Sequence, residues 1–233
     1  MSEERTPHAD PPASAEFDAY AGSYEEDHRS SVSASGEDPA YFHDYKVTCL
    51  ARKGLLDAGP LLDFGCGIGN LTERLAARCT EVHAYDPSAR SLARARERAP
   101  TAHIHDDAKT IPRAHFATVV LSGVLHHVAP SARAELLRTV RGLLRPGGTI
   151  VVFEHNRLNP VTRRAVAACA FDDDAILLWP WEARGVLRSA GFTSVHTDYI
   201  VFFPRALAFL RPLEPRLRRV MLGAQQMILA TNP

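Results

Sequence analysis

The sequence predicts an α/β fold in which a mainly parallel sheet is covered by helices on both faces. Apolar runs with the character of strands alternate with amphipathic helical segments from Leu61 to Phe153, which is the pattern of repeated strand–helix–strand units. A glycine-rich turn follows the first of these strands, and acidic side chains end the next two. The chain of 233 residues is long enough to form one such domain with a full core.

We divide the chain into three parts by composition. Residues 1–15 are polar and carry several prolines, which predicts a disordered tail. Residues 16–58 predict a helical cap, because aromatic residues recur at helical spacing, and one helix is expected over 39–53. Residues 59–233 predict the core, with a helical insertion at about 157–180.

The core begins with a short buried strand at 61–64. Further strands are expected at 81–85, 103–105, 118–121, 149–153 and through 195 to 199, with a last strand at the sheet edge over 226–230. Helices are expected over 70–78, 88–99, 132–144 and 181–190. The basic stretch 205–219 has an apolar side, and we favour an ordinary surface helix over a lid that admits the acceptor or contacts lipid.

Composition narrows the class of protein. Lysine plus arginine and aspartate plus glutamate both number 27, so the formal net charge is zero and no general attraction to nucleic acid is expected. The four cysteines are widely separated, as is typical of a reduced, cytoplasmic protein. The N-terminal residues lack the apolar segment of a secretory signal, and no apolar run is long enough to cross a bilayer. We therefore expect a cytoplasmic protein without stable membrane insertion.

The stretch 61–70 reads LLDFGCGIGN and predicts a nucleotide-type binding turn. A strand that leads through glycines into a helix offers backbone N–H groups and the positive end of the helix dipole to a ligand. A phosphate-binding P-loop would need a Gly-Lys-Ser/Thr ending, and a dinucleotide fold would need a glycine where Asn70 stands. Asp63 at the head of the turn would repel pyrophosphate and instead suits a cationic cofactor that bears an amino group.

Acidic residues end the next two predicted strands. Asp86 is placed to accept hydrogen bonds from both hydroxyls of a ribose. Asp107 can accept from an adenine amino group, with Ala108 beside the ring. Each aspartate alone could simply cap a helix. Because the carboxyl ends of parallel strands meet at one edge of a sheet, the combination with the glycine turn favours one nucleoside-binding rim.

Five segments together resemble the S-adenosylmethionine-dependent methyltransferases of the Rossmann-like class, and are most similar to the bacterial small-molecule branch. In order and spacing they are 61–70, 85–88, 106–108, 121–128 and 144–148. The resemblance extends from about Tyr20 to Phe153. It implies the Rossmann-like methyltransferase fold, a seven-stranded sheet whose last strand is antiparallel. It also implies S-adenosylmethionine as cofactor and S-adenosylhomocysteine as product.

The resemblance assigns cofactor contacts by position. Gly65, Cys66 and Gly67 would lie along the methionine part of the cofactor, together with Asp63. The remaining predicted contacts are Asp86 for the ribose, Asp107 and Ala108 for the adenine, Ser122 for the sulfonium side, and Pro87 as a further cofactor contact. Tyr24 either closes over the cofactor or packs within the cap helix.

Histidines at the next strand ends are the candidates for catalysis. His126 and His127 follow the fourth strand of the core and His155 ends the fifth, and an imidazole that titrates near neutral pH suits a general base. Support of the cofactor loop is the alternative role for one of them. Asn156 and Tyr20 are predicted to contact substrate, against the alternatives of an exposed turn and of packing within the cap.

Two other groups of polar residues receive plainer interpretations. Lys46 is expected to be solvated. No metal site is predicted, because His103 and His105 share a strand face without the carboxylate-and-cysteine spacing that would support one. The acidic run 172–174 favours a helix cap or a solvated turn.

Taken together, these patterns predict a methyltransferase. The expected reaction moves a methyl group from S-adenosylmethionine to oxygen or nitrogen of a small molecule, in a bacterial pathway for a specialised metabolite, a sugar or a nucleotide. The alternatives are a different reaction of the same sulfonium cofactor, or a binding module without catalysis. No nucleic-acid partner is expected, and the oligomeric state is left open.

Overall fold

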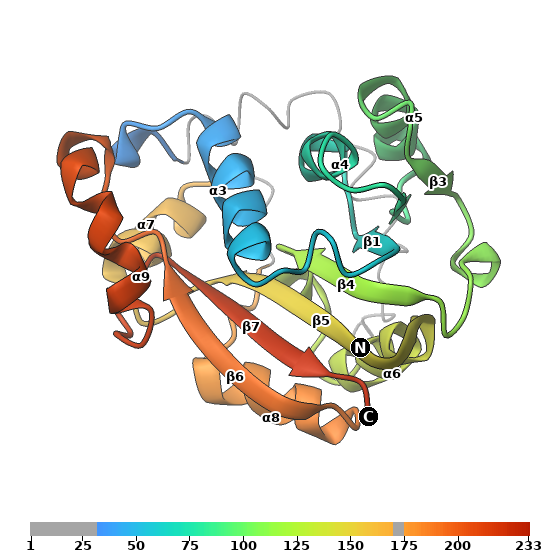
Figure 1. Ribbon diagram of the computed structural model, residues 1–233. Coiled ribbons are helices and arrows are strands. Elements are labelled where there is room, and N and C mark those ends of the chain that lie inside the picture. The colour runs from blue at the N-terminus through green and yellow to red at the C-terminus, as the bar shows by residue number, and fades with distance from the viewer. Residues whose placement is uncertain (1–31, 170–174) are drawn as a thin grey trace, which may run out of the picture.

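The computed structural model describes residues 32–169 and 175–233, and one mixed sheet runs through the middle of this part (Figure 1). Its strands are β1 (Leu61–Phe64), β2 (Val82–Tyr85), β3 (His103–His105), β4 (Phe116–Ser122), β5 (Leu144–His155), β6 (Thr193–Ile200) and β7 (Gln225–Thr231). They lie in the order β3-β2-β1-β4-β5-β7-β6. The first five are parallel, and β7 is antiparallel to both β5 and β6. The predicted fold class is confirmed.

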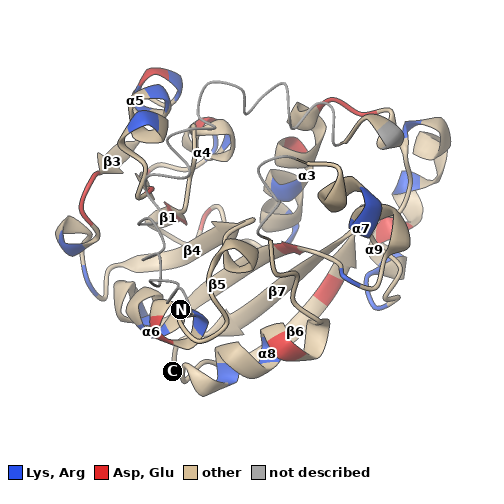
Figure 2. Cartoon of the chain, turned by 180° about the vertical axis from the view of Figure 1, so that it is seen from behind, with Lys and Arg blue, Asp and Glu red and all other residues tan. Residues whose placement is uncertain are grey.

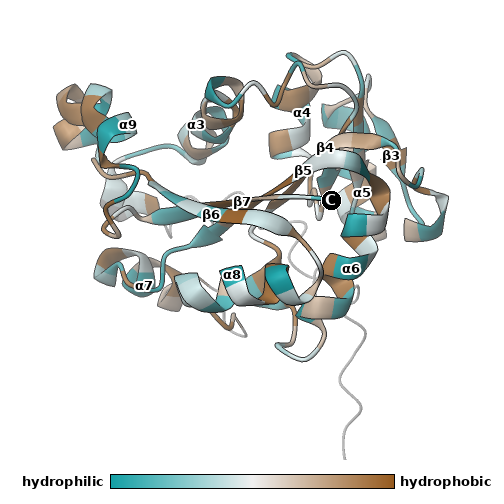
Figure 3. Cartoon of the chain, turned by 60° about the horizontal axis from the view of Figure 1, so that its bottom comes forward, coloured by the Kyte–Doolittle hydropathy of each residue, from teal (hydrophilic) through white to brown (hydrophobic). Residues whose placement is uncertain are grey.

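Helices cover both faces of the sheet (Figure 3). They are α3 (Pro39–Arg52), α4 (Asn70–Ala76), α5 (Ala89–Arg98), α6 (Arg133–Leu143), α7 (Pro160–Ala167), α8 (Pro180–Ser189) and α9 (Glu214–Leu217), with short 3-10 segments η1 (Ser33–Ser35), η2 (Ala108–Thr110), η3 (Leu125–His127) and η5 (Arg205–Leu213). The observed α3 lies within one residue of the helix expected over 39–53. Tyr20, Tyr24 and the acidic run 172–174 lie outside the described residues, as does the predicted tail.

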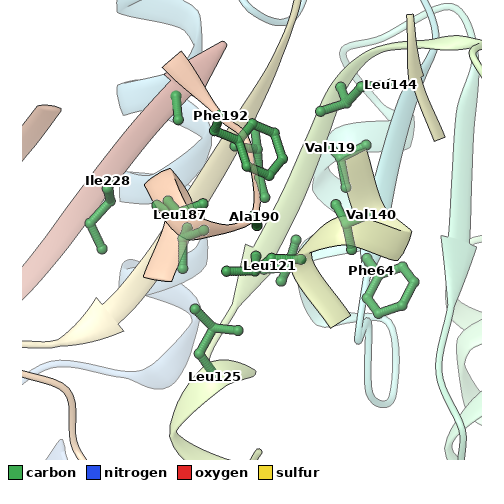
Figure 4. Close-up of a cluster of buried hydrophobic side chains, with 14 of the residues drawn as sticks. Phe64, Val119, Leu121, Leu125, Val140, Leu144, Leu187, Ala190, Phe192 and Ile228 are labelled. Atoms are coloured by element: carbon green, nitrogen blue, oxygen red, sulfur yellow. The ribbon is translucent and has the colours of Figure 1, made fainter. Parts of the chain in front are cut away.

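Two apolar clusters hold the layers together. On one face, residues of α6 and α8 such as Leu137 and Leu187 pack against Val119 and Leu121 of β4, as Figure 4 shows for part of this cluster. On the other face, α3 and α4 pack against the sheet, and Leu50 is fully buried there. Burial of apolar surface on both faces explains why the parallel strands are almost continuously hydrophobic. Because α3 packs directly on the sheet, its inward residues are fixed relative to the strand ends.

The last strand is not at the sheet edge, contrary to the sequence prediction. β7 lies between β5 and β6, and its residues Gln226–Ala230 are all at most 5% exposed. A run buried on both sides is the pattern of an interior strand. β5 is also longer than expected. It begins at Leu144 because Gly147 and Gly148 exchange backbone hydrogen bonds with Asn232, just beyond β7.

The basic stretch after β6 lies beside α3. Arg211 forms an ion pair with Glu37 and stacks 4.2 Å above the ring of Tyr41. Glu214 is buried, accepts from the Phe202 N–H at 3.0 Å and is hydrogen-bonded to the Tyr45 hydroxyl. The segment is a 3-10 stretch followed by one turn of helix, and not the single surface helix favoured from the sequence.

The outer surface carries both signs of charge. Basic and acidic residues lie side by side on α5 and α8 (Figure 2), in keeping with the zero net charge of the chain. Among the residues that the structure describes, no helix combines the length and the apolar character needed to span a membrane.

The buried face of α8 gives a test of the packing. Leu187→Ala should lower the free energy of unfolding by about 2–5 kcal/mol, because it leaves a cavity between α8 and the sheet. Leu187 is fully buried, whereas Leu222 is 67% exposed, and Leu222→Ala should change the value by less than about 0.5 kcal/mol. Urea unfolding of both variants measures the difference. Equal effects of the two substitutions would contradict the assigned core.

Candidate functional site

A cavity of about 510 Å³ opens at the carboxyl ends of β1, β2, β4 and β5. It brings together most of the residues singled out from the sequence. Those that line it are Asp63, Gly65, Cys66, Gly67, Asp86, Pro87, Ala108, Ser122, His126, His127 and His155. The wall opposite the strand ends comes from α3, which contributes Phe42, His43 and Lys46. Residues of α4, α6 and α7 also line the cavity, so strand ends and several helices form a single site.

The glycine turn presents bare backbone to this cavity. A side chain at Gly65 would place its Cβ 2.5 Å from Cγ2 of Val124, so the turn and the loop after β4 are in contact only because the residue is glycine. Gly67 has a φ of +53°, and nothing lies within 4 Å of the position that its Cβ would take. A ligand can therefore lie directly against the main chain at Gly67.

Asp86 fixes the turn in place. Its Oδ2 accepts from the Gly67 N–H at 2.8 Å and its Oδ1 accepts from the Ser88 N–H at 2.9 Å. The side chain is only 8% exposed and lines the cavity. Carboxylate oxygens have further lone pairs, so the ribose contact expected from the sequence stays a prediction beside this structural role.

Asp63 supplies a buried acceptor at the base of the cavity. It is 1% exposed, and its Oδ2 accepts from the Thr72 hydroxyl at 2.7 Å. Its Oδ1 is buried without a hydrogen-bond partner among the described residues. Burial raises the pKa of Asp63 to about 6, against the lowering effects of the Thr72 hydrogen bond and of Lys46. An unpartnered carboxylate oxygen in a cavity wall fits the ammonium group of a cationic cofactor.

Lys46 is the main residue that the sequence interpretation missed. The expectation of a solvated side chain was wrong: Lys46 is 9% exposed, and its Nζ donates to the Ser122 Oγ at 2.7 Å. The ammonium lies 5.7 Å from the centre of the Phe153 ring. Burial lowers its pKa to about 8, although the carboxylates of Asp63 and Glu154 act in the opposite direction.

The helical spacing contained a signal for this placement. Lys46 stands four residues after Phe42 and four before Leu50, both of which are buried. Residues at that spacing lie on the same face of a helix. His43, one turn before Lys46, is also buried and lines the cavity. The inward stripe of α3 is therefore partly basic.

Glu154 is a second missed residue, and it holds the histidine loop. It is 2% exposed; its Oε1 accepts from the Leu125 N–H at 2.8 Å, and its Oε2 lies 2.6 Å from His126 Nδ1. Burial alone would raise the pKa of Glu154, but the adjacent His126 lowers it on balance, helped by His155 and by the Leu125 N–H. An ionised Glu154 fixes the His126 ring with its Nδ1–H toward the carboxylate.

Three imidazoles lie together above this carboxylate. The ring centre of His126 is 4.2 Å from that of His127 and 5.1 Å from that of His155. All three line the cavity. The structure thus brings the predicted catalytic histidines together, and their catalytic role stays a prediction.

Two predicted contacts lie away from the cavity wall. Asn156 is fully buried, and its Nδ2 donates to the backbone oxygens of Met221 and Gly223 at 3.0 and 2.7 Å while its Oδ1 accepts from the Leu158 N–H. The predicted substrate contact is therefore corrected to a structural role, since these partners use the amide. Asp107 is exposed, and its Oδ1 accepts from the Lys109 N–H at 2.9 Å. Its contact with adenine stays a prediction.

Comparison with protein families identifies the central part of the chain. Residues 61–148 match the model of a methyltransferase domain. An uncharacterized methyltransferase of Mycobacterium tuberculosis is 42% identical over 97 residues, 40% of this chain and 48% of the relative. A trans-aconitate 2-methyltransferase of Variovorax paradoxus is 36% identical over 126 residues, 51% of this chain and 48% of the relative. The chain thus spans about half the length of these curated relatives.

Solved structures share the fold. A possible histamine N-methyltransferase of Thermotoga maritima has a TM-score of 0.67 at 18% identity, with 95% of this chain and 100% of the other covered. Magnesium protoporphyrin IX methyltransferase of Synechocystis with bound S-adenosylmethionine has a TM-score of 0.62 at 15% identity, with 97% and 100% covered. The seven-stranded arrangement is therefore that of known methyltransferase structures.

Replacement of Glu154 tests the buried pair. Glu154→Gln should lower the free energy of unfolding at pH 7 by about 1.5–3 kcal/mol, because a charge-assisted hydrogen bond is lost. The pKa of Glu154 is lowered in the folded protein, so its stabilising effect is present above the ordinary glutamate value and is lost as the pH falls through the lowered pKa. In denaturant unfolding, the difference from wild type should shrink below about pH 4.3.

Glu73→Gln is the matched control, because it makes the same substitution at an exposed position. Its free energy of unfolding should equal that of wild type at each pH. A Glu154→Gln penalty that stays constant down to pH 3 would show that the carboxylate charge does not contribute.

Proposed function

We propose that this chain, which carries a methyltransferase domain of the Rossmann-like class and takes S-adenosylmethionine as its cofactor, methylates an acidic oxygen of a small molecule. The observation that carries the proposal is the ammonium of Lys46, buried in the wall of a cavity that His43, His127 and His155 also line. A basic wall of this kind favours an acceptor that carries negative charge.

The cofactor half of the site would lie at the strand ends. When bound, S-adenosylmethionine supplies a methyl group on a positively charged sulfur. Asp63 Oδ1 would accept from the amino group of the methionine part, since it lacks a partner among the described residues. The backbone at Gly65 and Gly67 would lie along the same part, and Asp86 would accept from the ribose. Ala108 would pack beside the adenine.

The acceptor half would lie between α3 and the histidine loop. Lys46 would pair with an anionic oxygen, because its pKa near 8 leaves it positively charged at neutral pH. The two carboxylates that act on Lys46 would have other partners. Asp63 would bind the amino group of the cofactor, and Glu154 accepts from the Leu125 N–H and contacts His126. Fixed donors on one side and a seated cofactor on the other would align the reacting atoms, which is the main requirement of a displacement reaction.

The need for a base depends on the acceptor. A carboxylate is already ionised at neutral pH, whereas a phenol or an enol must lose a proton. His126 is the best placed of the three predicted histidines for that step. Its Nδ1–H faces Glu154 at 2.6 Å, so a neutral ring carries its accepting lone pair on Nε2. This arrangement parallels the carboxylate-oriented histidine of hydrolytic triads.

The relatives give limited support for the acceptor class. The Variovorax paradoxus protein is named for trans-aconitate, which is a tricarboxylate and so agrees with a basic acceptor wall. The Thermotoga maritima structure is named as a possible histamine N-methyltransferase, which keeps nitrogen as the alternative acceptor atom. Assays with acids and amines as acceptors separate these two possibilities.

Asp63→Asn tests the cofactor half. The affinity for S-adenosylhomocysteine, which retains the amino group, should fall about tenfold to a hundredfold in calorimetry because a charge-assisted hydrogen bond is lost. Wild-type affinity should also fall as the pH drops through about 6, where Asp63 takes up a proton, and this decrease should be absent in the variant. The exposed Asp57→Asn serves as control. Unchanged binding by Asp63→Asn would refute the placement of the amino group.

Lys46→Met tests the acceptor half. Wild-type protein should form S-adenosylhomocysteine with members of a panel of small carboxylic acids and phenols, trans-aconitate included, and not with amines. The KM for the acid should rise about tenfold or more in Lys46→Met, because the charge-assisted contact is lost. In wild type the KM should also rise above about pH 8, where the Lys46 ammonium loses its proton.

Lys53→Met is the matched control, because Lys53 directly follows the same helix but is paired with Asp198. Methylation of amines alone, or an acceptor KM that is indifferent to Lys46→Met, would overturn the acidic-oxygen proposal. Such a result would leave the cofactor assignment intact.

A further inference from the structure

A second polar cluster lies at the opposite end of the sheet from the cavity. Glu81 immediately precedes β2, His83 is the second residue of β2, and His115 immediately precedes β4. Since β1 lies between β2 and β4, the three side chains meet across the start of β1. This is the amino-terminal edge of the parallel strands, whereas the cavity lies at their carboxyl ends. The cluster has no part in the proposed methyl transfer.

The three side chains converge on one point. Oε1 of Glu81 lies 3.0 Å from Nε2 of His83 and 2.9 Å from Nε2 of His115. One ligand atom from each residue falls within a span of 4.8 Å. Tetrahedral zinc with bonds of about 2.0–2.1 Å to nitrogen and oxygen keeps its ligand atoms roughly 3.3 Å apart. Small side-chain rotations would therefore admit an ion.

A hydrogen-bond chain behind His83 fixes the ring nitrogen that faces the cluster. His83 Nδ1 lies 2.9 Å from His105 Nε2, and His105 Nδ1 lies 3.3 Å from the Thr110 hydroxyl, which donates to the Asp107 carbonyl at 2.7 Å. With neutral rings, a proton on Nδ1 of each histidine satisfies the links behind His83, from His105 to the Asp107 carbonyl. The Nε2 lone pair of His83 then faces the Glu81 carboxylate at 3.0 Å, and this pair of acceptors is satisfied when a cation lies between them.

The opposite proton arrangement makes the hydrogen bond to Glu81 but gives up the 3.3 Å link between His105 and Thr110. If the His83 Nε2–H donated to Glu81, then His105 would have to donate through Nε2 and accept at Nδ1. Thr110 would then need its one hydroxyl hydrogen both for His105 and for the Asp107 carbonyl. The outer hydrogen bonds thus support the metal-binding tautomer of His83, as outer partners commonly do at metal sites. The 3.0 Å contact with Glu81 supports the other tautomer when no ion is bound, so binding of an ion would move the His83 proton from Nε2 to Nδ1.

We propose that Glu81, His83 and His115 form a site for a divalent transition-metal ion of the zinc class. Two imidazoles and one carboxylate form a donor set that suits zinc and its neighbours better than magnesium or calcium, which prefer oxygen alone. Access is open, since the side chains of Glu81 and His115 are 39% and 36% exposed while His83 is 9% exposed. A bound ion would link β2 to β4 on either side of β1.

The sequence interpretation missed this site because its ligands come from separate segments. His103 and His105 drew attention as a pair on one strand, yet neither is a proposed ligand. His105 contacts His83 through its Nε2, and the His103 ring lies 4.7 Å from that of His83. Glu81, His83 and His115 come together only when β1 is inserted between their strands. No local spacing rule connects residues 81 and 115.

Metal titration of the full, tag-free chain tests the proposal. After treatment with a chelator, calorimetry with Zn²⁺ should show one ion bound per chain, and Co²⁺ should give the visible absorption of a tetrahedral nitrogen and oxygen site. Glu81→Gln and His115→Gln should each weaken Zn²⁺ binding at least tenfold, and His105→Gln should weaken it by about tenfold to a hundredfold through loss of the outer hydrogen bond. His196→Gln in β6 is the distant control.

Each variant should still bind S-adenosylhomocysteine. This binding shows that the variant is folded and that its cofactor site is intact. Zn²⁺ should raise the melting temperature of wild type and not that of Glu81→Gln or His115→Gln. Failure to bind Zn²⁺ and Co²⁺ would overturn the proposal and identify the cluster as a set of hydrogen bonds. Equal affinity in all variants, or binding abolished by S-adenosylhomocysteine, would also overturn it, because the ion would then lie elsewhere.

Discussion

The burial of Lys46 between two carboxylates is the interaction on which the site depends. A buried ammonium is costly unless opposite charge lies nearby, and both Asp63 and Glu154 act on it. The three residues come from α3, β1 and β5. Their mutual compensation therefore ties the helix that forms the outer wall to the strand ends that form the inner wall, while Asp63 Oδ1 has no hydrogen-bond partner among the described residues.

Under the two proposals, one sheet would serve two kinds of chemistry at its two ends. At the carboxyl ends, loops carry backbone N–H groups, carboxylates and imidazoles around a deep cavity. At the amino ends, the shallow cluster of Glu81, His83 and His115 lies against Phe116, whose ring is 5.0 Å from those of His83 and His115. Because β1, β2 and β4 take part in both, an ion at one end would stiffen the strands that hold the cofactor turn at the other.

Local patterns in the sequence were sufficient for the fold class, for the glycine turn and for the ends of most elements, since strand and helix periodicity depend on neighbouring residues. They were insufficient where distant segments decide the outcome. β7 became interior because β6 pairs outside it, and Asn156 became structural because the backbone at Met221 and Gly223 reaches it. Lys46 was recoverable from its spacing to Phe42 and Leu50, but a lysine is ordinarily read as solvated.

The contact between Gly65 and Val124 has an evolutionary consequence. Because a Cβ at residue 65 would lie only 2.5 Å from the valine methyl, a residue with a side chain can replace Gly65 only if the loop after β4 changes as well. Under the proposed function, changes of acceptor would then fall on α3, where His43 and Lys46 line the cavity from a separate element. His43 could be exchanged without touching the glycine turn, whereas loss of Lys46 would also remove the positive charge that acts on Asp63.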